Sequence, residues 1–118
     1  MGELHHECGV AAIYHRQSPT PSRLAPLGGP DQVSRLMPQM LLDLQNRGQL
    51  AAGFTTFNPR REQLIDTYRQ VGTVIEAFRL NHLAKHESIM RDTGGRAAIG
   101  HVRYATCGTN DKSHAQPF

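Results

Sequence analysis

A cysteine near the start of the chain is the residue best suited to covalent chemistry. Cys8 is followed by a glycine and by a short apolar run, so residues 8–14 predict a strand buried on both faces with the thiol at its tip. If residues 1–7 were removed, Cys8 would carry a thiol nucleophile and a free α-amino group that could serve as its base. The alternative is an inert core cysteine, because free cysteine is among the most buried residue types.

Two arginines are further candidates for a site. Arg47 lies between a predicted helix and a predicted strand, next to a glycine; ordinary helix termination is the alternative interpretation. Arg103 lies inside the predicted strand 97–105, where a guanidinium is costly unless it pairs with a carboxylate. With Thr106 close by, Arg103 therefore suggests a site that binds a carboxylate.

The composition is that of one globular domain. The chain has 118 residues and a formal net charge of +3, from 13 Lys and Arg against 10 Asp and Glu that are scattered along the sequence. Such a small, dispersed excess does not favour a nucleic-acid partner. Two cysteines far apart, no apolar leader and no apolar stretch of about 20 residues predict a protein of the reducing cytoplasm without a membrane partner.

Hydrophobic periodicity predicts the elements that would position these residues. Residues 16–30 are rich in Pro, Ser and Gly and predict a surface loop. An amphipathic helix follows, with Asp31 as its N-cap and Pro38 either kinking it or marking its true start. The apolar stripe of this helix consists of Val33, Leu36, Met37, Met40, Leu41 and Leu44.

The rest of the chain predicts a hairpin, a helix and a last strand. The hairpin has strands at 51–57 and 63–70, the helix covers 73–86, and the last strand is 97–105. This order indicates an α/β (α+β) domain with a mainly antiparallel sheet that lacks a closing element at its C-terminal end.

Metal binding is a minor alternative. His82 and His86 share one helical face but lack the pattern of a metal-binding helix, so they predict a solvated face. The run His5, His6, Glu7 and Cys8 has suitable donor atoms in a cramped local segment. We therefore predict no metal and no cofactor in this chain.

Four motifs in one order give the chain a specific resemblance. They are Cys8-Gly9, Arg47-Gly48-Gln49-x-Ala51-Ala52-Gly53, Gly100-His101-Val102-Arg103-Tyr104-Ala105-Thr106-x-Gly108 and Ala115-Gln116-Pro117-Phe118. In this order they resemble the class II, or N-terminal cysteine, glutamine amidotransferases. Within that superfamily the amidophosphoribosyltransferases, which commit phosphoribosyl pyrophosphate to purine synthesis, are the most similar.

The resemblance implies a fold and a site. The fold would be the four-layer αββα sandwich of N-terminal nucleophile hydrolases, with residues 1–7 as a propeptide and 8–118 as the N-terminal part of the amidotransferase domain. Cys8 would be catalytic; the remaining site residues follow from the matching motif positions. Arg103, Thr106 and Cys107 would bind substrate, and Gly9, Arg47 and Tyr104 would support the site. Leu50 departs from the family pattern, which usually has an aspartate there.

The resemblance also implies partners. L-glutamine would be the substrate, and a synthase domain or a second chain would complete the site, with magnesium expected only in the phosphoribosyltransferase domain. Because the family's oxyanion-hole residues follow the last motif, we expect the isolated chain to be weakly active or inactive, and the full-length protein to be a homo-oligomer. The alternatives are another class II amidotransferase, such as a glucosamine-phosphate, glutamate or asparagine synthase, or an inactive binding relic that retains residues 1–7.

Overall fold

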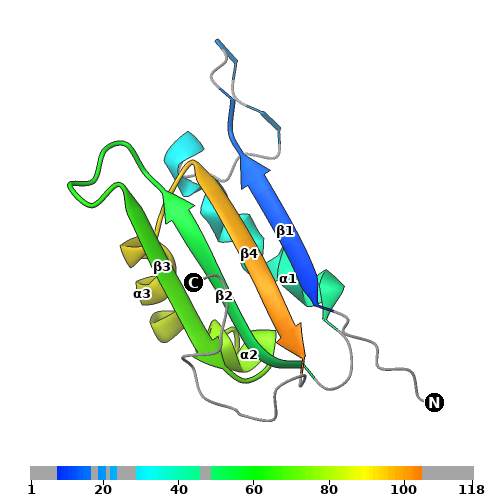
Figure 1. The fold of residues 1–118 in the computed structure, drawn as a ribbon. Helices are drawn as coiled ribbons and strands as arrows, with labels where there is room; N and C mark the ends of the chain where they lie inside the picture. The colour runs from blue at the N-terminus through cyan, green and yellow to red at the C-terminus, as the bar shows by residue number, and fades with distance from the viewer. Residues whose placement is uncertain (1–7, 17–18, 21, 24–28, 46–48, 105–118) are drawn as a thin grey trace.

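A computed structural model describes residues 8–16, 19–20, 22–23, 29–45 and 49–104 (Figure 1). Its elements are β1 (Gly9–Tyr14), the 3-10 helix η1 (Pro30–Leu36), α1 (Met37–Leu44), β2 (Gln49–Phe57), β3 (Ile65–Val71), α2 (Val74–Ala77), α3 (Leu83–Asp92) and β4 (Ala97–Tyr104). The strands form one four-stranded sheet in the order β1-β4-β2-β3, and every neighbouring pair is antiparallel. The predicted α+β class with an antiparallel sheet is therefore confirmed.

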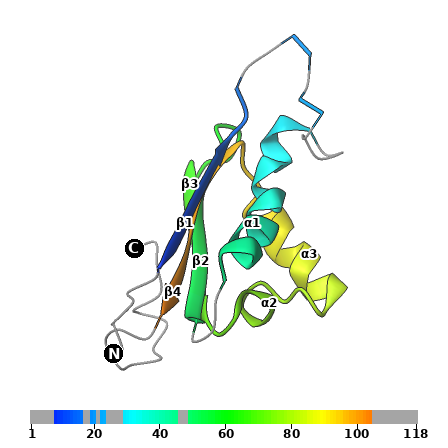
Figure 2. The same ribbon diagram turned by 90° about the vertical axis from the view of Figure 1, so that its right-hand side faces the viewer.

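The helices lie together on one face of the sheet (Figure 2). Between the helices and the sheet, the side chains of Phe54, Val102, Met37 and Leu41 are fully buried. Helix α1 approaches β4 so closely that a Cβ added to Gly100 would lie 2.5 Å from the Met37 sulfur. We call this side of the sheet the helix face, and the opposite side the open face.

Pro38 marks the beginning of α1. The proline occupies the first turn of α1, where its missing N–H costs nothing, and the residues before it form η1 instead of a kinked continuation. The prediction that Asp31 is an N-cap is wrong. Asp31 lies inside η1, and its carboxylate pairs with Arg96 at 2.9 Å and with Arg60 at 3.0 Å, so two tertiary ion pairs hold it.

The prediction of one helix over 73–86 is also wrong, because two helices occupy this region. Thr73 and Glu76 form a capping box that starts α2, which ends after Ala77. Arg79 then adopts a positive φ of 56° and breaks the helical path. The imidazole of His82 accepts a hydrogen bond from the Lys85 N–H and so caps the start of α3.

The open face carries no described helix, and this corrects the prediction that β1 is buried on both sides. Along β1 the side chains alternate between half-buried and exposed, with Val10 70% and Tyr14 62% exposed. Ile99 of β4 and Ile65 of β3 lie on the same face and are also more than half exposed. The sheet therefore presents an apolar surface to solvent within the described part of the chain.

Membrane crossing finds no support in the described helices. The longest, α3, has ten residues, and none has the length and apolar character that a bilayer span requires.

Candidate active site

The sheet brings Cys8 and Arg103 to the same end of two neighbouring strands. Gly9, the first residue of β1, is the partner of Val102 in β4. The start of β1 lies beside the end of β4 (Figure 1). Continued by one residue, the antiparallel register sets Cys8 opposite Arg103. Cys8 is exposed.

Arg103 lies on the open face of β4. Successive side chains of a strand point to opposite faces. Val102 and Tyr104 are buried on the helix face, so Arg103 between them points to the open face, where it is half-buried. On its other side, β2 provides Ala51 as the partner of Arg103, and this alanine is buried.

Gly9 and Tyr104 support this end of the sheet from the helix face. A Cβ added to Gly9 would lie 2.8 Å from Val102 Cγ2 and 3.0 Å from Leu44 Cβ, so a larger residue would push the start of β1 away from α1. The Tyr104 hydroxyl donates a hydrogen bond of 3.4 Å to the carbonyl of Leu44, which ties the end of β4 to the end of α1.

Three predicted site residues lie outside the described part of the chain. They are Arg47, Thr106 and Cys107. Their neighbours in sequence are described: β2 begins at Gln49, whose partner in β4 is Tyr104. The segments that carry Arg47 and Thr106 therefore join the sheet at the end where Cys8 and Arg103 lie.

His101 is a residue of this region that the sequence interpretation did not single out. It lies two residues before Arg103 on the same face, is 9% exposed, and its Nδ1 has no hydrogen-bond partner among the described residues. Burial, with the positive charge of Arg103 as a second cause, lowers the pKa of His101. Its place in the Gly100–Arg103 motif was the only signal in the sequence.

Comparison with known proteins finds relatives over almost the whole chain. A protein named amidophosphoribosyltransferase 1, chloroplastic, from Arabidopsis thaliana is 38% identical over 112 residues, 95% of this chain. The amidophosphoribosyltransferases of Archaeoglobus fulgidus and Methanothermobacter thermautotrophicus are 35% and 32% identical over 94% and 98% of it. This chain is a homologue of the amidophosphoribosyltransferases. No protein-family model matches it.

The relationship confirms the resemblance that the four motifs indicate. The chain spans 16% to 20% of the length of the relatives named above. Most of the length of each relative therefore has no counterpart in this chain.

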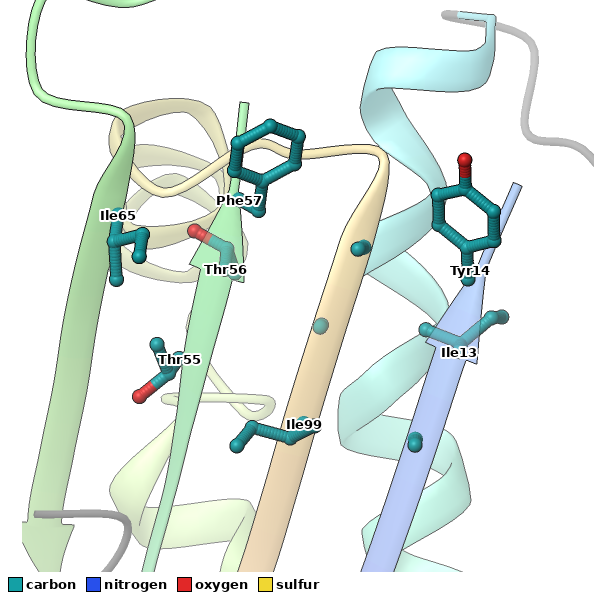
Figure 3. Close-up of a pocket in the computed structure, with 10 residues that line it drawn as sticks. Ile13, Tyr14, Thr55, Thr56, Phe57, Ile65 and Ile99 are labelled. Atoms are coloured by element: carbon teal, nitrogen blue, oxygen red, sulfur yellow. The ribbon is translucent and has the colours of Figure 1, made fainter. Parts of the chain in front are cut away.

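A hollow on the open face lies away from Cys8. It is an open groove of about 410 Å3 at the opposite end of the sheet, and its lining is mostly apolar (Figure 3). Tyr14, Phe57, Ile65 and Ile99 provide its large apolar side chains. The open face is thus apolar at the groove end and polar at the end with Arg103 and His101.

The described residues include no group of three His, Cys, Asp or Glu side chains that could hold a metal ion. His82 caps α3, as described above, and His86 Nδ1 lies 2.7 Å from the carbonyl oxygen of Phe78. Each of these two rings is therefore engaged with the backbone. The alternative site at residues 5–8 falls mostly outside the described part of the chain.

Proposed function

We propose that this chain contributes the nucleophile and the carboxylate-binding arginine of a glutamine amidotransferase site. The observation that carries the proposal is the register of β1 and β4, which brings Cys8 opposite Arg103 at one end of the sheet. A nucleophile beside a group that grips an α-carboxylate suits hydrolysis of the side chain of an amino acid. Homology to the amidophosphoribosyltransferases supports glutamine as that amino acid.

Cys8 acts as a terminal nucleophile once residues 1–7 are removed. The free α-amino group, with an ordinary pKa of about 7.7–8.0, takes the proton of the thiol. The thiolate then attacks the side-chain carbonyl carbon of glutamine, the C–N bond breaks, and ammonia leaves with the proton that the amine held. Water hydrolyses the γ-glutamyl thioester, which releases glutamate and restores the Cys8 thiol.

Arg103 holds the α-carboxylate of glutamine through its planar fork of N–H donors. Thr106 and the backbone of Cys107 make further substrate contacts. Arg47 orders the pocket near the nucleophile, while Gly9 and Tyr104 keep the strand ends packed on α1.

We further propose that the open face is the inner face of an αββα sandwich. Exposed side chains such as Val10 and Tyr14 are unusual for a finished surface, because large exposed apolar patches mark interfaces. A second sheet, from the remainder of the protein or from a second chain, covers them and completes the site.

In the whole protein the ammonia passes to a phosphoribosyltransferase part that uses phosphoribosyl pyrophosphate for purine biosynthesis. Magnesium belongs to that part, and the full-length protein is a homo-oligomer. The names and greater lengths of the relatives support the phosphoribosyltransferase part. The magnesium, the purine pathway and the homo-oligomer follow from the resemblance that the four motifs indicate.

Selective alkylation of Cys8 tests the proposal. An electrophilic glutamine analogue with a diazoketone in place of the amide is added to the whole protein, processed so that it begins at Cys8, because the remainder of the protein completes the site. The labelled residue is found by mass spectrometry. We expect saturable labelling at Cys8 that L-glutamine blocks and D-glutamine does not.

The second cysteine provides the matched control. Cys107→Ser should keep the labelling, and Cys8→Ser should abolish it. If the analogue labelled both thiols equally and L-glutamine gave no protection, the amidotransferase proposal would be wrong and the chain would be a non-catalytic relic of the fold.

A further inference from the structure

His101 occupies a special position on the open face. Its register partners are Val10 in β1 and Gly53 in β2, so the imidazole lies in the row of side chains next to the row of Arg103 and Ala51. Residues two apart on one strand share a face. Arg103 is therefore the next side chain on this face of β4, and its charge is the second cause that lowers the pKa of His101.

The ring is buried and has an unused polar atom. The side chain is 9% exposed, and Nδ1 forms no hydrogen bond within the described residues. A buried polar atom without a partner destabilises the folded state, and most buried polar atoms in folded proteins have a hydrogen-bond partner. A nitrogen left in this state beside an anion-binding arginine indicates a partner that arrives with a ligand.

The neighbouring residues indicate the chemistry of that ligand. Gly53 has no side chain and Val10 has no polar atom, so neither row partner can offer the ring a side-chain hydrogen bond. A ligand whose carboxylate is bound by Arg103 would place its other functional groups beside the imidazole ring. An α-amino acid suits this place, because its ammonium group donates and its carboxylate accepts, so either tautomer of a neutral imidazole finds a partner.

We propose that His101 is a second ligand-binding side chain of this site, whose Nδ1 hydrogen-bonds the α-amino-acid end of the molecule held by Arg103. The inference rests on the proposed function, since it takes glutamine as that molecule. His101 assists recognition and has no part in bond breaking. Its removal therefore weakens binding and leaves the reactivity of the bound nucleophile unchanged.

Two amide variants test which nitrogen matters. An asparagine amide reaches about as far as Nδ1 and a glutamine amide about as far as Nε2, so His101→Asn keeps the proposed hydrogen bond and His101→Gln loses it. The rate of Cys8 alkylation is measured against the concentration of the diazoketone analogue in the whole protein, processed so that it begins at Cys8. We expect His101→Gln to raise the half-saturating concentration about tenfold or more, as for loss of a hydrogen bond to a charged group. His101→Asn should stay within about threefold of wild type, and the maximal rate should be the same in all three.

Iodoacetamide separates this role from a structural one, because it alkylates thiols without an α-amino-acid end. Its rate at Cys8 should not differ among the three proteins. Equal half-saturating concentrations in all three, or a parallel change in the iodoacetamide rate, would overturn the proposal.

A measurement on the unaltered protein covers the case in which the variants fold poorly. Imidazole 15N NMR of the whole wild-type protein should show a shift of the His101 Nδ1 signal when L-glutamine is added and none with D-glutamine. Binding of L-glutamine without a shift at Nδ1 refutes the role of His101 while the proposed function stands. If glutamine did not bind, or if Cys8 were not labelled selectively, the proposed function itself would be refuted.

Discussion

The two faces of the sheet differ in how far the described chain completes them. On the helix face, Phe54 and Val102 have no exposed surface beneath α1, α2 and α3. On the open face, Val10 is 70% exposed and Ile99 51%. Both faces are built from the same four strands, so strand sequence alone does not explain the contrast.

The difference shows which part of the fold is self-sufficient. The helix face obtains its cover from segments that follow closely in sequence, and Arg35 of η1 joins Glu87 of α3 through two bonds of 2.7 Å. The open face holds an apolar groove at one end and the Arg103–His101 pair at the other. The face that the described chain leaves open is thus also the face that carries the polar groups of the candidate site.

The largest expected effect is a difference in unfolding free energy between variants of two phenylalanines of β2, which lie on opposite faces of the sheet. Phe54 lies on the helix face with 0% exposure, and Phe57 lies on the open face with 37%. Phe54→Ala should lower the free energy of unfolding by about 3–5 kcal/mol, because it leaves a cavity in a closed core. Phe57→Ala should cost about 1 kcal/mol or less, since much of its ring already contacts water.

Urea unfolding of both variants provides the comparison. Equal losses would mean that something covers the open face in the isolated chain, for example a second copy. In that case the loss for Phe57→Ala should depend on protein concentration.

Two arginines near opposite ends of β4 separate binding from stability. Arg103→Met should raise the half-saturating concentration of the diazoketone analogue about 10- to 100-fold, because a charged hydrogen-bonding partner of the carboxylate is lost. Arg96, which precedes β4 and pairs with Asp31 at 2.9 Å, is the matched control. Arg96→Met should lower stability and leave the half-saturating concentration of the folded fraction unchanged.

The opposite assignment would follow if Arg103→Met reduced stability without affecting the concentration dependence of labelling. Arg103 would then be a structural residue of the open face, and the carboxylate site would have to lie elsewhere.

Local sequence signals were sufficient for most strands and for the start of α1. The hairpin pattern located β2 and β3, although β2 begins two residues earlier and β3 two residues later than predicted, and Pro38 marked the first turn of α1. The signal failed where tertiary contacts decide. Asp31 forms an ion pair with Arg96 instead of capping a helix. Arg79 adopts a left-handed backbone conformation, which its residue type does not predict.

The candidate site shows the same division. Motifs identified Cys8 and Arg103 as residues of interest, but their proximity depends on the strand order β1-β4-β2-β3, which spacing along the chain does not determine. Periodicity likewise could not assign the open face, because covering elements set which side of a strand is buried. His101 was missed for that reason, since only the folded sheet shows that its Nδ1 has no hydrogen-bond partner among the described residues.

Variants at two threonines test how much local hydrogen bonds contribute to stability on the two sides of the sheet. Thr73 accepts a hydrogen bond from the Glu76 N–H at 3.2 Å and begins α2, whereas the Thr55 hydroxyl lies 2.8 Å from that of Thr67 on the open face. Thr73→Ala should cost about 1 kcal/mol, because an N-cap is lost. Thr55→Ala should cost about 0.5 kcal/mol or less, since the cross-strand pair is exposed to water. Thermal unfolding measures both, and a larger loss for Thr55 would place more of the stability on the open face than the contrast allows.

The smallest effect that we expect is a difference in pH dependence. Acid should reduce the stability of the open face and of the helix face in different pH ranges. Burial and the charge of Arg103 lower the pKa of His101. The folded state then binds the proton less readily than the unfolded state, whose histidine pKa is about 6.5. Its contribution to stability is present above pH of about 6.5 and is lost as the pH falls through the lower folded pKa.

Glu76 responds in a different range. Its hydrogen bonds with the backbone N–H and side chain of Thr73 lower the pKa of the carboxylate. The stabilisation it provides is therefore present above pH of about 4.3 and is lost as the pH falls through the lower folded value. His101→Gln should remove part of the stability loss in the upper range and Glu76→Gln part of the loss in the lower one. If His101→Gln left the pH dependence between about 6.5 and 4.3 unchanged, the ring would be equally protonated in both states, and the open face would be wet where the structure has it buried.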